Sequence, residues 1–525
     1  MARAVASADG WIATPEIPVD YRGPAGPPLR VFGPAGRDRP ALASLRAAVA
    51  RHPERVAVED AEHRLDFAEL AAAVARLGGL LAEGTGPVGL LLPNGAAYPV
   101  AVFACLAAGR PAVLLDAGHP PERTAALLRL TGTRQVVARA GVDLAGAAVL
   151  PVERAFAAGP AGSLGDGPLG QDAPAFILCT SGSTGQPKAI VHSQRTVLHQ
   201  VAALIDGLHL GEADRFLAVT SGAAIAGLFS LFVPLAGCAF QALALGPAGH
   251  RLLREALLGR PVTVLRAAPS LLRSIARRPE APAMLAGLRA IRTSGEPLLP
   301  GDVALLAGCL PKDCLILGGY GATEAPGTTW FARAEDAQDP HRVAAGVLDP
   351  ETEAMIQDEQ GAPCPPGEPG ELVIRSRFTA LGEWQDGGLV AGRLQPDPAD
   401  PARWIYRTGD LARLAADGTF LVFGRLDRMV KVNGQRVELA EVETVLRQSP
   451  EVAEAAVVAR TDAGRVLLLA YVVPVPGTED GLAERLRARL RQALPGPMQP
   501  ARLALLAALP RLPGGKLDEA ALPGG

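Results

Sequence analysis

The chain has 525 residues, too many for one ordinary domain, and this length indicates two to four subdomains. Hydrophobic residues make up 49% of the chain and charged residues 20%, so a large core can form and disorder of the whole chain is excluded. The formal net charge of −3 gives no electrostatic reason to expect nucleic acid or an anionic membrane as a partner.

Cysteine usage and the N-terminal residues indicate a cytoplasmic location. The six cysteines show neither a CxxC pair nor the spacing of zinc ligands, so we expect reduced, mostly buried thiols. The first thirty residues include Asp9, Glu16 and Asp20 and have no long apolar run, which excludes a signal peptide.

Alternating helices and strands are predicted from about Pro40 onward. Apolar residues recur at helical spacing over residues 41–51 and 67–81, and Asp66 is a plausible N-cap with Glu69 as its capping-box partner. A further helix is predicted over residues 97–107. Short apolar strands alternate with these helices, which is typical of a parallel sheet buried on both faces. The predicted strands are residues 88–92, 111–115, 176–179, 215–219, 262–265, 290–293 and 314–317.

One segment, Val219 to Gly249, has no charged residue and is long enough to span a bilayer. Glycines and a proline interrupt it at positions 222, 227, 234, 237 and 246. We therefore expect a buried helix followed by a buried strand, and no membrane span.

The pattern of predicted elements changes after about Pro350. Turn-rich segments at 361–370 and 395–403 separate short predicted strands at 371–374 and 419–423. Beyond Arg425 a compact βαβ-like pattern is predicted, with a helix at 439–448, strands at 455–459 and 466–473, and a helix at 482–494. We expect an N-terminal extension (1–39, loosely ordered), an N-terminal core (40–426) and a C-terminal domain (427–525).

A run rich in glycine and hydroxyl groups, Thr180 to Lys188 (TSGSTGQPK), follows the predicted strand at 176–179. Glycines let successive backbone N–H groups face one anion, hydroxyls add donors, and a lysine supplies a point charge for a phosphate. The run is not a Walker A loop, because the spacing of that motif is absent. Alone, it also fits a polar strand-to-helix loop.

Three further segments carry candidate chemistry. In Gly318–Glu324 (GGYGATE) an aromatic face suits adenine and a carboxylate suits a metal-bound phosphate. In the segments around Asp410 and Arg425, a carboxylate can accept both ribose hydroxyls and a guanidinium can bind phosphate or ribose. The last segment places Lys516 on a glycine loop. Alone, these segments equally fit a plain turn, surface hairpins and a tail.

Together and in this order, the four segments resemble the adenylate-forming superfamily of acyl-CoA synthetases, nonribosomal-peptide adenylation domains and firefly-type luciferases. The resemblance runs from about Ala41 to Leu522, and TSGSTGxPK and YRTGDL…GRxDxxVKxxGxRVELxEVE are its most specific parts. The chain has only four lysines, and three of them (Lys188, Lys431 and Lys516) lie in these motifs, whereas Lys312 does not.

The resemblance implies an α/β fold. It consists of a large, multi-subdomain N-terminal domain with parallel-type sheets flanked by helices and a distorted β-barrel, and a small, mobile α+β C-terminal domain that rotates about a hinge at Asp427. The implied cofactors are ATP and Mg²⁺, and the implied first step joins a carboxylate to the α-phosphate and releases pyrophosphate.

The resemblance also assigns residue roles. Lys516 would be catalytic together with Glu324 and Thr184, and the last two would hold Mg²⁺. One departure is Ala189, which stands where the family usually has glycine after the lysine. The implied ATP-binding residues are Thr180, Ser181, Gly182, Ser183, Thr184, Gly185, Lys188, Gly295, Glu296, Pro297, Gly319, Tyr320, Gly321, Ala322, Thr323, Asp410, Val422 and Arg425.

The substrate pocket follows from aligning Pro-Leu-Ala-Gly237 with the family's helix end. Ala224 then stands where amino-acid-activating relatives have an aspartate for the α-ammonium, so an α-amino acid is disfavoured, since an unpaired buried ammonium is costly. Two arginines in the pocket suit a substrate with a second anionic or strongly polar group, unless they point outward. The pocket residues are Ala224, Ile225, Leu228, Arg266, Arg292, Ser294, Gly319, Gly327 and Thr328.

The acceptor of the activated acid is implied to be a thiol. Gly434, Gln435 and Arg436 would form the thiolation loop, and the stretch up to Glu441 resembles peptide-synthetase adenylation domains more than CoA ligases. Since the chain ends just after Lys516, we expect a carrier protein in trans to supply the phosphopantetheine. An acyl-CoA ligase, transfer to an amine or other nucleophile, and a non-catalytic adenylate sensor or scaffold remain as alternatives.

Overall fold

The computed structural model describes residues 5–6, 10–13, 39–158, 162–181, 187–244, 249–293, 295–296, 298, 300–333, 336, 345–385, 387–426, 429–432, 435–462, 465–511, 517–519 and 521–523. The chain divides into two compact units. The first consists of Met1–Ala354 and Ile374–Tyr406, and the second of Met355–Val373 and Arg407–Gly525. Each unit is described by itself.

The first helices of the larger unit form where the apolar spacing predicts them. Helix α2 spans Ala41–Arg51, α3 spans Phe67–Ala82 and α4 spans Ala97–Ala107. Asp66 accepts a hydrogen bond from the Glu69 backbone N–H, and the Glu69 side chain accepts one from the Asp66 backbone, so the predicted capping box is confirmed.

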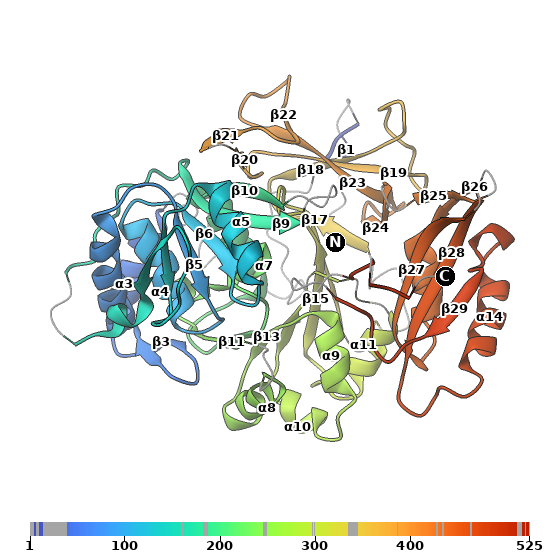
Figure 1. Ribbon diagram of the computed structural model, residues 1–525, viewed down its shortest axis with the longest axis horizontal. Helices are drawn as coiled ribbons and strands as arrows, with labels where there is room; N and C mark the ends of the chain where they lie inside the picture. The colour runs from blue at the N-terminus through green and yellow to red at the C-terminus, as the bar shows by residue number, and fades with distance from the viewer. Residues whose placement is uncertain are drawn as a thin grey trace. The chain divides into compact units, whose positions relative to one another are not determined.

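Helices α3 and α4 lie beside a sheet whose central strands are parallel (Figure 1). The strand order is β21-β20-β10-β9-β6-β5-β7-β8, in which β8, β7, β5, β6 and β9 are parallel neighbours and β10, β20 and β21 follow antiparallel. The strands are β5 (Val88–Leu92), β6 (Ala112–Asp116), β7 (Gln135–Ala138), β8 (Ala148–Pro151), β9 (Pro174–Ser181), β10 (Pro187–Ser193), β20 (Gly382–Gln385) and β21 (Gly388–Val390).

A second run of strands in this unit has the order β17-β16-β15-β14-β13-β11-β12-β3-β4. From β3 to β15 the neighbours are parallel, whereas β4, β16 and β17 pair antiparallel. The strands are β3 (Val56–Glu59), β4 (Arg64–Asp66), β11 (Arg215–Ala218), β12 (Ala239–Ala242), β13 (Val264–Arg266), β14 (Ala290–Arg292), β15 (Leu315–Tyr320), β16 (Thr328–Ala332) and β17 (Ala345–Leu348).

The remaining helices of the larger unit connect these strands, and α8, α9 and α10 lie below β13 in Figure 1. They are α5 (Pro121–Thr131), α6 (Gln194–Leu208), α7 (Ile225–Ser230), α8 (Gly249–Gly259), α9 (Pro269–Ala276), α10 (Ala281–Leu285) and α11 (Pro300–Ala307). A few residues of the N-terminal extension are described, and there β2 (Ile12–Ala13) pairs with β18 (Thr352–Gln357) while Trp11 is buried.

The uncharged segment after Val219 is largely buried, as predicted. Its helix α7 is followed by a 3₁₀ turn (Val233–Ala236) and by strand β12. Between them Phe232 packs edge-on against Phe103 of α4 and Phe176 of β9. In the described part of the chain, no helix is both long and apolar enough to cross a membrane.

The smaller unit contains the predicted βαβ-like pattern. Strands β27 (Val452–Asp462) and β28 (Arg465–Pro474) are antiparallel, and β29 (Arg502–Leu505) joins β28 in parallel. Helix α14 (Leu482–Ala493) lies alongside this sheet in Figure 1. Helix α13 (Leu439–Arg447) shares one apolar core with α14 and the sheet, formed by residues such as Val442, Leu446, Val457, Leu468 and Leu486.

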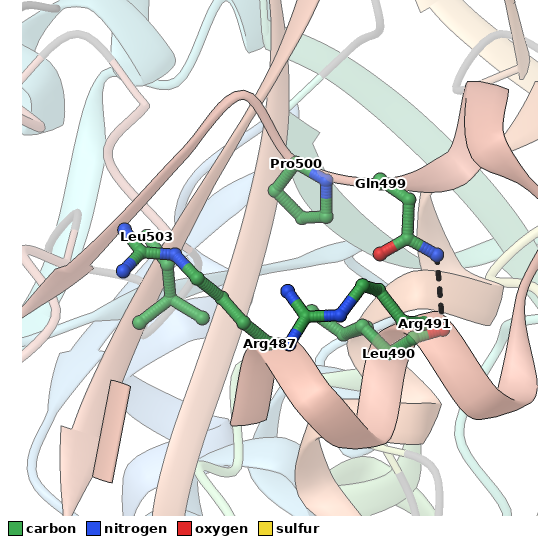
Figure 2. Close-up of a pocket in the computed structure, with 6 residues that line it drawn as sticks. All are labelled: Arg487, Leu490, Arg491, Gln499, Pro500 and Leu503. Atoms are coloured by element: carbon green, nitrogen blue, oxygen red, sulfur yellow. Dashed lines mark hydrogen bonds between the residues drawn. The ribbon is translucent and has the colours of Figure 1, made fainter. Parts of the chain in front are cut away.

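A shallow pocket of about 160 Å³ lies on α14 and the segment leading into β29. Figure 2 shows the Gln499 side chain donating a hydrogen bond to the Leu490 carbonyl, 2.9 Å away, at one end of this pocket. Its lining residues are Arg487, Leu490, Arg491, Gln499, Pro500 and Leu503. None of them is a predicted site residue.

The expected fold class is confirmed as a large α/β N-terminal part with mixed sheets and a smaller C-terminal part. The boundary near residues 424–428 and the barrel stay predictions. Asp427, the predicted hinge residue, lies outside the described residues. Between the two parts of the first unit, the chain contributes Met355–Val373 to the second unit, and the sequence does not predict this.

Candidate active site

The predicted phosphate loop is flanked by two antiparallel strands. Strand β9 pairs with β10, and Ser181 stands opposite Pro187 while Thr180 stands opposite Lys188. The alternative of a strand-to-helix loop is therefore wrong on its C-terminal side, where β10 follows. Four predicted ATP-binding residues of this run lie outside the described residues: Gly182, Ser183, Thr184 and Gly185.

Lys188 forms an ion pair that the sequence does not predict. Its Nζ lies 2.7 Å from Oε1 of Glu383 on β20, and the side chain of Glu383 is only 8% exposed against 29% for Lys188. The pairing follows from the sheet, because β10 and β20 are antiparallel neighbours in which Ile190 stands opposite Glu383. A largely desolvated carboxylate thus balances the charge of the phosphate-loop lysine.

The second glycine-rich motif lies at the end of β15 and in the turn to β16. A Cβ on Gly318 would come within 2.0 Å of the Trp330 ring, and a Cβ on Gly327 would come within 1.9 Å of the Tyr320 carbonyl oxygen. Both approaches are closer than any side chain permits, so these two glycines are required by packing. Tyr320, the proposed adenine contact, ends β15 opposite Thr328.

A buried histidine holds this turn against the strand that follows the phosphate loop. Nε2 of His192 on β10 lies 2.8 Å from the Thr323 carbonyl oxygen, and its Nδ1 lies 3.3 Å from Oγ1 of Thr196. Burial lowers the pKa of His192 to about 4, against the opposing effect of the hydrogen bond to Thr323. The ring is therefore neutral at pH 7, with its proton on Nε2 donated to Thr323.

Glu324, the next residue, is held through its backbone. Its carbonyl oxygen accepts a hydrogen bond from the Ala380 N–H at 2.8 Å, and its side chain is half-buried. Among the described residues its carboxylate has no hydrogen bond or ion pair, so its oxygens are available for a hard cation. No three His, Cys, Asp or Glu side chains gather as a metal site in the part of the chain that the structure describes.

The segment before α7 is positioned by polar side chains from neighbouring loops. Asn94 donates to the Thr220 and Leu243 carbonyls and accepts from the Gly222 N–H, while Asp116 accepts from the Ser221 hydroxyl. These contacts fix the start of the helix that carries Ala224, Ile225 and Leu228. Ala224 is exposed at the N-cap, Ile225 is half-buried and Leu228 is fully buried.

The two predicted pocket arginines lie side by side. Arg266 ends β13 and Arg292 ends β14, and the two are cross-strand partners in parallel register. Arg266 is 3% exposed and donates from Nη1 to Oγ of Ser230 on α7 at 3.3 Å. Arg292 donates from Nη1 to the Gly318 carbonyl at 2.6 Å. The outward orientation is therefore wrong for Arg266, which points into the protein.

The other predicted residues of this unit lie close by or outside the described residues. Thr328 is buried, and a Cβ on Gly319 would come within 2.9 Å of Nη2 of Arg292. The carboxylate of Glu296 accepts hydrogen bonds from the N–H and the hydroxyl of Ser270 at the start of α9, so its side chain has a structural role. Ser294 and Pro297 lie outside the described residues.

In the second unit, Asp410 and Arg425 form an ion pair. They stand opposite each other on β23 (Trp404–Leu414) and β24 (Phe420–Arg425), with 3.0 Å between Oδ1 and Nη1. The Thr408 hydroxyl accepts a hydrogen bond from the Asp410 N–H and donates to the Leu372 carbonyl. Val422 is half-buried on the same strand as Arg425. The sequence analysis proposed separate roles for Asp410 and Arg425, and the structure couples them.

The remaining predictions in this unit fall at its least described positions. Lys516 and Gly434 lie outside the described residues. Gln435 and Arg436 begin strand β26 (Gln435–Glu438), which pairs with β25 (Met429–Val432). All six cysteines are free, and Cys105, Cys238, Cys309 and Cys314 are buried.

The chain matches known proteins over most of its length. Residues 45–384 match a family model described as AMP-binding enzyme, and residues 441–516 match the AMP-binding enzyme C-terminal domain. The chain is 33% identical over 557 residues to phosphinothricin tripeptide synthetase PhsC of Streptomyces viridochromogenes, which covers 100% of the chain and 49% of that protein. The chain thus spans about half of that relative.

Another relative is matched over most of its own length. The chain is 33% identical over 496 residues to novobiocin biosynthesis protein H of Streptomyces niveus, which covers 90% of the chain and 81% of that protein. Among solved structures, holo-AB3403, a four-domain nonribosomal peptide synthetase bound to AMP and glycine, is similar with a TM-score of 0.79 and 25% identity, over 93% of this chain and 36% of that one.

Proposed function

The chain belongs to the AMP-binding enzyme family, within the adenylate-forming superfamily, and on that premise we propose that it activates a carboxylic acid with ATP. An oxygen of the substrate carboxylate attacks the α-phosphorus of ATP, the bond to the departing pyrophosphate breaks, and an acyl-adenylate remains. The observation that carries this proposal is the 2.8 Å contact between His192 and the Thr323 carbonyl. It joins the strand after the phosphate loop to the turn that carries Tyr320 and Glu324.

Each motif has a proposed part in this step. The run from Thr180 to Lys188 binds the β- and γ-phosphates, Tyr320 stacks on adenine and Asp410 accepts the ribose hydroxyls. Lys516 orients the substrate carboxylate and the α-phosphate, because a cation between two anions lowers their repulsion and stabilises the charge that develops between them. Residues 427–525 are proposed as the C-terminal domain that presents Lys516, with Asp427 as hinge.

Mg²⁺ is the proposed metal, with Glu324 and Thr184 as ligands from the chain. When bound, the metal neutralises part of the phosphate charge. The fit rests on Glu324, whose half-buried carboxylate has no partner among the described residues.

We propose the phosphopantetheine thiol of a carrier protein as the acceptor. The thiolate sulfur attacks the acyl carbon, the bond to the AMP oxygen breaks, and a thioester and AMP result. Support comes from the relatives, which include a peptide synthetase, and from the peptide-synthetase-like stretch from Arg436 to Glu441. An acceptor other than a carrier, either CoA or an amine, is an outcome that the assay below distinguishes.

An ordinary α-amino acid is not the proposed substrate. Ala224 at the N-cap of α7 has no charge to pair with an α-ammonium, and the sequence has no acid from Val219 to Gly249. The ends of β13 and β14 instead carry two guanidinium groups, which repel an ammonium group.

The proposal is tested by ATP–pyrophosphate exchange with a panel of monocarboxylates, dicarboxylates, aryl acids and amino acids. We expect exchange with at least one non-amino acid and little with amino acids. Acceptor assays with a phosphopantetheinylated carrier protein, CoA and a simple amine follow for the active acid. Absence of exchange with every acid would overturn the proposed activity, and robust thioester formation with CoA alone would overturn the proposed acceptor.

A further inference from the structure

Arg266 is a buried cation for which the described residues provide no anion. Within the described part of the chain, its guanidinium has one hydrogen-bond partner, the Ser230 hydroxyl, and its Nε is buried without a partner. No carboxylate among the described residues forms an ion pair with it. Burying an unpaired guanidinium opposes folding. A bound anion would offset this cost in the liganded state.

Arg292 places a second cation beside the first. Cross-strand partners in a parallel pair project from the same face of the sheet, so both side chains extend from neighbouring strand ends. Burial, and after it the charge of Arg292, lower the pKa of Arg266 to about 9. The repulsion between the two arginines is therefore not relieved by a nearby acid in the described part of the chain.

Asp349 is the carboxylate that the described hydrogen bonds link to Arg292, and it already accepts two other hydrogen bonds. Asp349 accepts from the Gly327 N–H at 3.1 Å and from the Thr329 hydroxyl at 2.8 Å. Thr329 in turn is 3.5 Å from Nη2 of Arg292, so a hydroxyl separates that guanidinium from Asp349. Nη1 of Arg292 donates a hydrogen bond to the Gly318 carbonyl, which fixes the position of the guanidinium without neutralising its charge.

The pair also lies where open α/β sheets bind their ligands. Arg266 and Arg292 are the last residues of two adjacent parallel strands, and ligands of such sheets bind at the carboxyl ends of the strands. The neighbouring strand β15 ends with Gly318, Gly319 and Tyr320, which are part of the proposed nucleotide site.

We propose that Arg266 and Arg292 bind a second carboxylate on the acid that this enzyme activates, so that its substrate is a dicarboxylic acid. The proposal rests on the proposed adenylation activity. One carboxylate of the substrate forms the adenylate, and the other stays ionised between the two guanidinium groups, which match carboxylate oxygens in charge-assisted hydrogen bonds. The bound carboxylate supplies the counter-charge that no described residue provides at this position.

The test compares matched acids on the full chain by ATP–pyrophosphate exchange. The probes are succinate, glutarate, adipate, phthalate and terephthalate, each beside its monomethyl ester, which removes one charge and adds one methyl group. We expect at least one diacid to have a kcat/KM about 10- to 150-fold above that of its ester, which is the range for a lost hydrogen bond to a charged group.

Two variants assign that preference to Arg266. Arg266→Met removes the charge with little change in volume, and Arg266→Gln keeps a hydrogen-bond donor for Ser230 if the Met variant folds poorly. Either is expected to remove the preference, because KM rises more for the diacid than for its monoester. The control is Arg254→Met, which removes an exposed arginine of α8 that pairs with Glu280.

The possible failures are distinguishable. Equal activity with diacids and their esters, or an equal loss of both in the Arg266 variants, would overturn the dicarboxylate site and leave the adenylation activity standing. If no acid supports exchange, the proposed activity fails. Calorimetric titration of the same diacids then tests whether Arg266 and Arg292 bind them. Binding that Arg266→Met abolishes supports the site, and no binding to the unaltered chain overturns it.

Discussion

Two contacts outside the motifs determine how the motif residues are held. Glu383 pairs with Lys188 of the phosphate loop, and His192 donates to the carbonyl of Thr323 in the glycine-rich turn. Both contacting residues are nearly or fully buried, so each contact is shielded from water and from salt. They make the phosphate-loop lysine and the Glu324 turn sensitive to substitutions at positions that carry no recognisable motif.

Glu383→Gln is expected to lower KM for ATP severalfold. The substitution keeps the shape of the side chain but removes the charge that Lys188 now neutralises, so the lysine becomes more available to phosphate. Because Lys188 is partly exposed, the accompanying loss of stability is modest, on the order of 1 kcal/mol. Steady-state kinetics with varied ATP measure this effect. A KM that stays the same or rises would show instead that Glu383 holds Lys188 in its productive position.

His192 predicts a pH dependence of stability. Its pKa is about 4 in the folded chain and near 6.5 in the unfolded chain, so the unfolded state binds more protons between these values. The contribution of neutral His192 to the free energy of unfolding is therefore fully present above about pH 6.5 and is lost as the pH falls towards 4. Between pH 7 and pH 5 this loss is about 2 kcal/mol.

Urea denaturation at pH 7 and pH 5 measures the effect. His192→Gln is expected to lose less stability than the unaltered chain between the two pH values, because its side chain does not titrate. His250→Gln, at an exposed position, serves as the control and should follow the unaltered chain. An identical pH response in the His192 variant would contradict the assignment.

At the scale of elements, the turn between β15 and β16 depends on close backbone approach. Gly318 lies under the Trp330 ring, and Gly327 lies against the Tyr320 carbonyl, so strand pairing and motif conformation are linked. Arg292 binds the Gly318 carbonyl and extends this link to the neighbouring strand end. The turn is therefore part of the sheet rather than a loop attached to it.

Gly327→Ala is expected to lower the free energy of unfolding by about 2–4 kcal/mol, because its Cβ would overlap a backbone oxygen that cannot move independently. Gly321→Ala is the matched control in the same turn, since a Cβ there has nothing within 4 Å. Denaturation of both variants measures the difference. Equal stability of the two would show that the turn relaxes around the added methyl group.

Local pattern predicts most elements of this fold but not their pairing. Capping residues and apolar spacing predict the helix from Phe67 with its Asp66 cap, and short apolar runs predict strands at 262–265 and 290–293. The strands form at Val264–Arg266 and Ala290–Arg292, so Arg266 lies one residue beyond the predicted strand. The Glu383 partner of Lys188, 195 residues away, has no local signal. Its position follows from the order β20-β10-β9, which depends on how the whole sheet assembles.

At the scale of the molecule, the two units interleave along the chain. The segment Met355–Val373 contributes to the second unit before the chain returns to the first, so β18, β19 (Pro369–Ser376) and β23 each have residues in both. The boundary near residue 427, which the change in sequence composition indicates, stays a prediction.

Lys516→Ala is expected to reduce the rate of adenylation at least 100-fold while changing the affinity for ATP less than threefold, because the lysine acts on charge that develops during the reaction. Exchange kinetics and calorimetric titration with ATP separate the two effects. Lys312→Ala is the control, since Lys312 is an exposed lysine outside the motifs. An unaltered rate in the Lys516 variant would remove this residue from the proposed mechanism.

Residue identity and short-range spacing are enough to indicate the family, the order of the motifs and the types of chemical group available. Which of these groups meet depends on how the chain folds, and the structure shows it. It places Arg266 and Arg292 together with no acid paired to either among the described residues, gives Lys188 a buried carboxylate and gives Thr323 a neutral histidine. These contacts join residues that are 26 to 195 positions apart, and strand order and register set the two that join neighbouring strands. Register is a property of the assembled sheet, and short-range sequence patterns do not encode it.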